Sequence, residues 1–457
     1  MLKPEPDNHA DLPPGTAAQP GGFLARLLPW VPFHLAKSQT GRHAGMVVTG
    51  NVVNRALTFV IHSVLAHVME KPIFAIFNVT AMTLETVTEL ADLGLNVNLV
   101  RNYSLHAERN RNAALSVVQL VLRIKVLWVI VLTAALYWLA PQFAGLLRDR
   151  DGLTGPFRFA AVGLAGPVLF YFALAHLQAV QWFGRYILVN VLERIGLLAV
   201  VAALAVTGRL MFWSALSAWI LFPFLAAVLG LVLAPHDYFR IRRIEPNVPR
   251  EVFHFGKWAL LSSLLTLTLW RLDVFMMTPL STKEKLADYL FAVRLIALFQ
   301  VVSQGLSTAL LPRVGRFESV AECRGYIRLI WKLTPLVVVG AAAICLFAYP
   351  LMVIPFSAKA VPAVPIFRIL VAGEALMMLA APMSQLFYRL NRVDLICLMN
   401  VIMLVVCAGG NWVLIPRFAG MGAAVAYLLV KVSAMICTVA FVAYALRRRT
   451  AAGTLGD

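Results

Sequence analysis

Six side chains recur along one stretch of the chain at alternating steps of four and three residues. They are Asn78, Met82, Glu85, Glu89, Asp92 and Asn96. Because this spacing matches the turn of an α-helix, all six are predicted on one helix face. The residues between them, such as Ile76, Leu84 and Leu93, make the segment apolar enough to cross a bilayer. Three carboxylates on such a helix are costly unless their face meets protein or water.

The preceding segment carries a second stripe at helical spacing, in which one residue is basic. Its members are Asn51, Arg55, Thr58 and His62. Two neighbouring helices therefore offer a basic and an acidic stripe. One interpretation is a salt bridge between the helices that fixes their packing. The other is the wall of a hydrophilic transport pathway, which we favour for the whole pattern because several more charged helices follow.

Charged residues also interrupt the apolar segments of the second half. The cations are Arg271, Arg294 and Lys431, and the carboxylates are Asp273 and Glu374. Buried cations in spans normally face a cavity or an acidic partner. A purely structural alternative pairs Arg271 with Asp273 or Glu85 and lets Lys431 extend to the membrane surface. A full turn of apolar residues on each side of Lys431 weakens that alternative. The pair Glu193–Arg194 is predicted near a helix end and is interpreted as structural.

The composition identifies the class of protein. Hydrophobic residues make up 60% of the 457 residues, charged residues make up 14%, and the mean hydropathy is +0.79. Soluble chains of this length carry about a quarter charged residues, so the sequence predicts a multi-pass membrane protein. The net charge of +18 does not indicate nucleic acid, because the basic residues lie in short loops between apolar segments. The five cysteines show no metal-binding or disulfide spacing.

The apolar segments predict about twelve membrane-spanning helices. They cover residues 45–70, 73–100, 118–140, 157–182, 187–208, 211–234, 257–280, 285–312, 333–355, 366–388, 394–415 and 420–446. Lys and Arg concentrate in alternate loops, for example at Arg242, Arg313 and Arg447, and are scarce in the others. This asymmetry predicts that both termini are cytoplasmic.

The chain is predicted to divide into two lobes of about six helices each. The expected parts are a cytoplasmic tail with an interfacial segment (1–44), an N-terminal lobe (45–235), a cytoplasmic loop (236–256), a C-terminal lobe (257–446) and a cytoplasmic tail (447–457). An offset of 211 residues places Gly45 on Gly256 and Gly94 on Gly305. A repeat of this kind is typical of transporters whose binding site lies between the lobes.

Several short motifs carry a family resemblance. They are Ala91 to Leu95, Phe255-Gly256-Lys257, Leu260 to Ser263, Arg271-Leu272-Asp273, Tyr289 with Arg294, and Leu310-Leu311-Pro312-Arg313. Together they resemble bacterial polysaccharide flippases of the multidrug, oligosaccharidyl-lipid and polysaccharide exporter superfamily. The resemblance covers residues 45–105 and 255–315, and elsewhere it depends on the number and spacing of helices.

The resemblance implies a function. The expected fold is two six-helix lobes around a central cavity, and the expected cargo is an oligosaccharide linked to undecaprenyl diphosphate in the bacterial inner membrane. Cations that suit a diphosphate are Arg55, Arg271, Arg294 and Lys431. Carboxylates that neutralise them, or carry a coupling proton or sodium ion, are Glu85, Glu89, Asp92, Asp273 and Glu374. Expected partners are membrane lipid, a polysaccharide polymerase and export machinery. No catalytic residue, metal or cofactor is expected.

Two alternatives stay open. One is a cation-coupled exporter of small molecules from the same superfamily. Four cations in the cavity argue against it, because the export of cationic drugs should need few cavity arginines. The other is a membrane glycan polymerase or ligase. Such an enzyme is expected to have a large outer loop, whereas the longest one here is predicted from Pro141 to Pro156. Asp149 to Asp151 match a glycosyltransferase DxD pattern, but in that loop they fit a solvated turn better. Nucleotide-binding and hydrolase motifs are absent.

Overall fold

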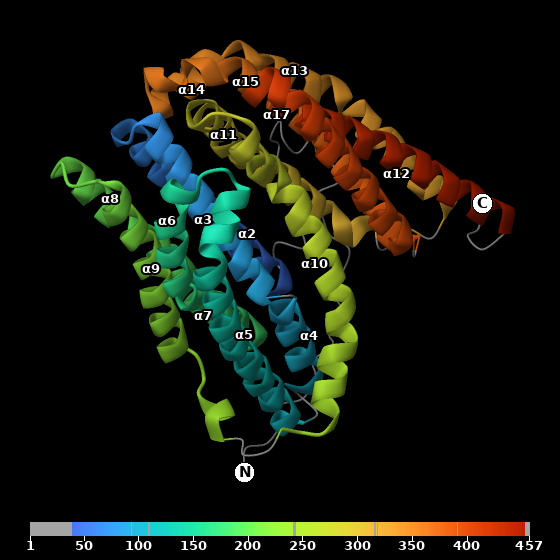
Figure 1. Cartoon of the computed structure of the whole chain (residues 1–457). Coiled ribbons are helices and arrows are strands. Elements are labelled where there is room, and N and C mark those ends of the chain that lie inside the picture. The colour runs from blue at the N-terminus through green and yellow to red at the C-terminus, as the bar shows by residue number, and fades with distance from the viewer. Residues whose placement is uncertain are drawn as a thin grey trace, which may run out of the picture. The chain divides into compact units, whose positions relative to one another are not determined.

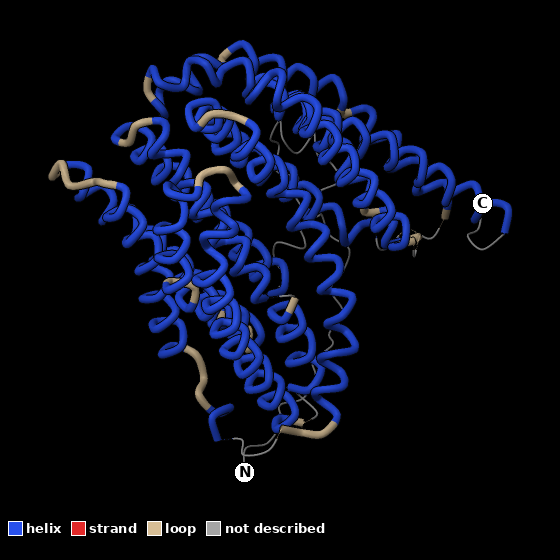
Figure 2. The backbone as a smooth tube through the Cα atoms, in the orientation of Figure 1, coloured by secondary structure: helices blue, strands red, loops and turns tan. Residues whose placement is uncertain are grey.

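The computed structural model describes residues 39–92, 94–107, 110–240, 244–314, 317, 319–390 and 392–452. These residues are almost entirely helical, and none of them forms a strand, so the predicted all-helical fold is confirmed (Figure 2). The predicted interfacial segment, residues 23–37, lies outside the described residues. So do the side chains of Phe255 to Lys257 and of Leu310 to Arg313, which carry part of the family resemblance.

The described part of the first half contains eight α-helices. They are α2 (Gln39–Val68), α3 (Lys71–Asp92), α4 (Leu95–Ala107), α5 (Arg111–Leu146), α6 (Arg150–Val162), α7 (Ala165–Ala179), α8 (Phe183–Val206) and α9 (Phe212–Leu233). The helix predicted for residues 73–100 is divided between α3 and α4. Gly94, at a φ of 75°, lies at this break, and a glycine tolerates that conformation because it has no Cβ.

The segment between the halves is shorter than predicted. A 3-10 helix, η2 (Asp237–Arg240), follows α9, and α10 (Asn247–Leu280) begins well before Gly256. The last ten residues of the predicted loop 236–256 are therefore helical. The predicted outer loop from Pro141 to Pro156 also differs, because α5 continues to Leu146 and α6 begins at Arg150.

The second half contains α11 (Lys283–Val314), α12 (Val320–Lys332), α13 (Thr334–Leu346), α14 (Ala348–Phe356), η3 (Ala358–Ala363), α15 (Val364–Ser384), α16 (Leu386–Arg389) and α17 (Val393–Ala452). Ala419 interrupts α17 with a φ of 49° and a ψ of −125°. This break separates the two segments predicted at 394–415 and 420–446. The C-terminal residues to Ala452 belong to the same helix, so the predicted tail begins in helical structure.

Seven helices of the described chain are long and apolar enough to span a membrane, or eight if the bent pair α6 and α7 counts as one span. The longest, Asp394–Arg447, has 54 residues with the Ala419 break inside it. A crossing needs about 20 residues, so this helix has the length for two. The protein is therefore a multi-pass membrane protein. The number twelve and the cytoplasmic placement of both termini stay predictions.

Helix packing joins the halves along a few seams within residues 46–457 (Figure 1). In the first half α7 and α8 pack on α9, and α5 packs on α4 and α6. In the second half α15 packs on α11 and α17, and α10 also packs on α17. Between the halves, α3 packs on both α10 and α11. The predicted repeat makes α3 and α11 equivalent helices, so one important seam joins corresponding parts of the two halves.

Candidate functional site

A cavity of about 780 Å³ lies between the two halves, enclosed by helices from both. All but one of the predicted site residues line it. They are Arg55 on α2, Glu85, Glu89 and Asp92 on α3, Arg271 and Asp273 on α10, Arg294 on α11, and Lys431 on α17. The exception is Glu374 on α15, which is 5% exposed and contacts the lining residues Tyr427 and Gln300. The cavity thus collects charges that are far apart in the sequence.

The acidic stripe of α3 faces this cavity, as its spacing predicts. Met82, Glu85, Glu89 and Asp92 line it, and so does Asn96 from α4 beyond the break. Glu85 and Glu89 have side-chain exposures of 32% and 54%, which place both carboxylates on the open wall of the cavity.

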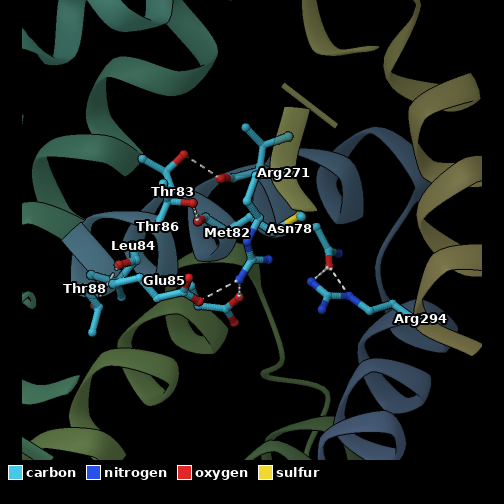
Figure 3. A network of polar contacts seen from close by, with 11 residues as sticks. Asn78, Met82, Thr83, Leu84, Glu85, Thr86, Thr88, Arg271 and Arg294 are labelled. Atoms are coloured by element: carbon cyan, nitrogen blue, oxygen red, sulfur yellow. Dashed lines mark hydrogen bonds and ion pairs between the residues drawn. The ribbon is translucent and has the colours of Figure 1, made fainter. Parts of the chain in front are cut away.

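Arg271 connects α10 to the acidic stripe. Its guanidinium lies 2.9 Å from Glu85 Oε2 (Figure 3). It also lies 3.5 Å from Glu89 Oε1. Of the two partners considered for Arg271, the structure selects Glu85. Asp273 is two residues away on the same helix, and that spacing points its side chain to another side. Arg271 is therefore neutralised by the first half of the chain.

A second ion pair at the cavity wall was not predicted from the sequence. Lys125 on α5 donates to Asp92 Oδ1 over 2.7 Å, and its side chain is 1% exposed. The same oxygen accepts the Asn96 amide hydrogen over 3.1 Å, which ties the end of α3 to the start of α4. A lysine in the middle of an apolar span was the available signal, since such a cation needs an acidic partner.

Neutralising Asp92 is expected to destabilise the protein. Asp92→Asn retains the acceptor for Asn96 but leaves the buried ammonium of Lys125 unpaired, at a cost of about 3–5 kcal/mol. We expect a lower melting temperature and a lower yield of monodisperse protein in detergent. The double variant Asp92→Asn/Lys125→Met removes both charges and should recover most of the loss. A double variant as unstable as Asp92→Asn alone would contradict this role of the pair.

Arg294 and Arg55 differ from the other cavity cations. Arg294 donates through Nε and a terminal nitrogen to Asn78 Oδ1, over 3.0 and 2.7 Å (Figure 3). Neither Arg294 nor Arg55 has a carboxylate oxygen within 4 Å in the described part of the chain, although both line the cavity. Two guanidinium groups thus face the cavity without a direct ion pair to a described carboxylate, although Glu85 lies near enough to interact electrostatically with Arg294.

The carboxylates of the second half have hydroxyl partners. Asp273 accepts a hydrogen bond from the Tyr289 hydroxyl and one from the Val274 amide over 2.8 Å. No basic side chain that the structure describes lies within 4 Å of Asp273. Glu374 accepts from the Tyr427 hydroxyl, and Lys431 lies 3.7 Å from Glu374. Lys431 also lies over the Tyr427 ring, 4.6 Å from its centroid, so its side chain points inward and does not extend to the membrane surface.

The basic stripe of α2 is only partly directed at the cavity. Arg55 and Thr58 line it together with Asn54, but Asn51 is exposed elsewhere. His62 is fully buried, with its ring 5.3 Å from that of Trp219.

The pair Glu193–Arg194 was predicted near a helix end, and this position is wrong. Since α8 begins at Phe183, the two residues lie almost three turns inside the helix and line the cavity. Their charged groups are 3.0 Å apart.

This arrangement suits an anionic ligand and a small cation. Unpaired guanidinium groups bind phosphate oxygens through two parallel hydrogen bonds. A buried carboxylate without a basic partner gains by binding a proton or a cation. The described residues contain no cluster of three His, Cys, Asp or Glu side chains that could hold a metal ion.

Comparisons with known proteins agree with this architecture. Residues 40–318 match a family model described as polysaccharide biosynthesis protein, and no curated protein matches the sequence. The fold resembles the lipid II flippase MurJ in an inward closed conformation, with a TM-score of 0.69, 10% identity and 86% of each chain covered.

Two conformations of multidrug resistance MATE family transporters of the MOP superfamily also resemble the chain. The inward-facing one has a TM-score of 0.73 at 14% identity and covers 88% of this chain and 96% of the other. The outward-facing one has a TM-score of 0.62 at 14% identity and covers 92% and 98%. The fold is therefore that of the MOP-superfamily transporters.

Proposed function

This chain belongs to the polysaccharide biosynthesis protein family, and we propose that it is a flippase of the bacterial inner membrane. Its cargo is an oligosaccharide repeat unit linked to undecaprenyl diphosphate, destined for a surface or exopolysaccharide. The glycan and the diphosphate pass through the cavity by alternating access, while the lipid tail stays in the bilayer. The protein is a transporter and catalyses no bond cleavage.

The observation that carries this proposal is the pair of cavity arginines that form no direct ion pair with a described carboxylate. Arg55 and Arg294 come from opposite halves, so a diphosphate between them is held by both lobes at once. The cost of leaving a cation unpaired in a membrane span is several kcal/mol, and a charge-assisted hydrogen bond to cargo recovers part of it. The lipid II flippase of the same fold supports a lipid-linked cargo by analogy.

A cation-coupled small-molecule exporter is the second candidate, and Asp273 is the observation in its favour. This carboxylate forms no ion pair within 4 Å in the described chain, so it is suited to bind a proton or a sodium ion. The same group also serves a flippase that uses an ion gradient, so it does not by itself favour drug export. A glycan polymerase is disfavoured because the predicted outer loop is reduced to the few residues between α5 and α6.

Depletion of the protein in its own bacterium tests the proposal. We expect surface polysaccharide to disappear and the lipid-linked repeat unit to accumulate in the cytoplasmic leaflet. The measurement is mass spectrometry of extracted lipids, combined with protection of the glycan from periodate added outside spheroplasts. A drug exporter predicts instead normal polysaccharide and greater sensitivity to cationic dyes. A polymerase predicts repeat units that accumulate but are accessible from outside.

A further inference from the structure

The seam between α3 and α11 contains three side-chain contacts stacked in register. Lys71 Nζ lies 2.6 Å from Asp288 Oδ1, and the rings of Phe74 and Phe291 are 4.9 Å apart. One turn further along each helix, Arg294 donates to Asn78. Successive pairs are three or four residues apart, so each step is about one helical turn of 5.4 Å. The last pair borders the cavity, and the first lies at the ends of both helices.

Further contacts close the same end of the two halves. Lys283, at the start of α11, lies 2.9 Å from Asp149 at the start of α6. Lys359 in η3 donates over 3.0 Å to each of two carbonyl oxygens, those of His67 and Met69, where α2 ends. We name the contacts of Lys71, Lys283 and Lys359 the outer layer, because the Lys and Arg distribution predicts this end outside.

An aromatic cluster lies beneath the outer layer. Its members are Phe59 on α2, Phe74 on α3, Phe291 on α11 and Phe356 on α14. The Phe291 and Phe356 rings are 5.3 Å apart, and those of Phe59 and Phe356 are 5.5 Å apart. Phe74, Phe291 and Phe356 are at most 1% exposed. The cluster therefore packs side chains from both halves together, one helical turn from the Asn78–Arg294 contact.

We propose that the Asn78–Arg294 contact is a sensor through which an anionic cargo group opens the outer layer. The inference rests on the proposed function, because it needs a cargo that carries a phosphate-like anion. The Arg294 guanidinium uses Nε and a terminal nitrogen on Asn78, the same pair of donors that would grip a phosphate. Cargo binding at Arg294 therefore competes with Asn78.

Loss of the Asn78 contact acts on the cluster above it. Asn78 follows Phe74 by four residues and Arg294 follows Phe291 by three, so each pair is on one face of its helix. When cargo takes Arg294, the phenylalanine pair and the Lys71–Asp288 ion pair are the two that remain of the three contacts described above. Because coupling between two sites is reciprocal, opening of the outer layer must equally strengthen binding at Arg294.

The amide at position 78 is what allows the exchange. A neutral amide binds a guanidinium less tightly than a carboxylate does, so a diphosphate displaces it. A carboxylate in its place competes directly with the cargo and holds α3 against α11. The residue type at position 78 thus determines how tightly the cargo must bind Arg294 before the outer layer opens.

Distances between spin labels across the outer layer test the sensor. Labels are placed at the exposed positions Glu70 and Glu284, in a chain whose five cysteines are replaced by alanine. The protein is reconstituted in nanodiscs, and its distance distribution is measured by pulsed electron resonance with and without inorganic pyrophosphate. Binding of pyrophosphate is measured separately by calorimetry. We expect pyrophosphate to raise the ratio of long to short distances by about five- to tenfold, within the usual range of coupling.

The variants separate the sensor from the binding site. Asn78→Asp should bind pyrophosphate weakly and keep the short distance at every concentration. Asn78→Leu removes the acceptor and should show the long distance without pyrophosphate, which keeps the test valid if the first variant does not fold. Asn110→Asp is the matched control, since it makes the same change at a helix N-cap outside the cavity and should respond as wild type.

The outcomes distinguish the two ideas. If pyrophosphate binds but the distances do not change, or if Asn78→Asp responds as wild type, the sensor is wrong while the proposed function stands. If neither pyrophosphate nor undecaprenyl diphosphate binds, the anionic cargo fails and the sensor fails with it. A response in wild type and Asn110→Asp that is absent in Asn78→Asp supports the sensor.

Discussion

Replacing Arg294 by alanine is expected to reduce surface polysaccharide more than a hundredfold per molecule of membrane-inserted protein. The side chain forms no direct ion pair with a described carboxylate, and the nearby Glu85 keeps its ion pair with Arg271, so the removal of Arg294 should not unfold the protein. It removes two charge-assisted hydrogen bonds to the cargo, together worth about 3 kcal/mol or more, and 1.4 kcal/mol is a factor of ten. The measurements are polysaccharide at the cell surface and lipid-linked intermediate in the cytoplasmic leaflet.

Two further variants make this prediction specific. Arg294→Lys keeps the charge but loses the planar fork, so it should retain a reduced part of the output. Arg209→Ala removes an exposed arginine outside the cavity and should export as wild type. Normal export by Arg294→Ala at wild-type protein level would remove the basis of the cationic cavity and leave the acidic face of α3 as the better candidate for the working site.

The sequence was sufficient to predict most of the charged residues that line the cavity, but not Lys125, Glu193 and Arg194. Helical spacing placed Glu85, Glu89 and Asp92 on one face, and the cost of charge in a membrane span directed that face away from lipid. The same cost predicted that Arg294 and Lys431, from helices far apart in the chain, face a cavity or an acidic partner. These rules depend only on the local sequence and on the membrane around it, so they can be applied before the fold is known.

Partners within the cavity were harder to predict. Lys125 was not predicted at the site because its relation to Asp92 depends on how α5 packs against α3. The division of one predicted helix at Gly94 was overlooked because a lone glycine does not by itself end a helix. Whether an arginine forms an ion pair depends on how neighbouring helices are aligned along their axes. A single sequence does not specify that alignment.

The difference between free and neutralised arginines gives the second large effect, at Arg271. This side chain is held by Glu85 and Glu89, so its removal exposes two like charges to each other on one face of α3. Arg271→Gln should therefore destabilise the protein by about 2–3 kcal/mol, less than a fully buried pair would because cavity water screens both carboxylates. We expect less membrane-inserted protein and a lower melting temperature in detergent.

The double variant Glu85→Gln/Arg271→Gln decides what the pair does. It removes the ion pair without leaving a strong charge imbalance, and two amides can hydrogen-bond across the same gap. If Arg271 serves to hold α10 against α3, the double variant should recover the protein level and export within about threefold of wild type, a difference below 1 kcal/mol. Recovered protein without recovered export would mean instead that Arg271 itself contacts the cargo, as the sequence pattern predicts for all four cavity cations. Glu85→Gln alone is the control, since Glu89 still neutralises Arg271 and only a small loss of stability is expected.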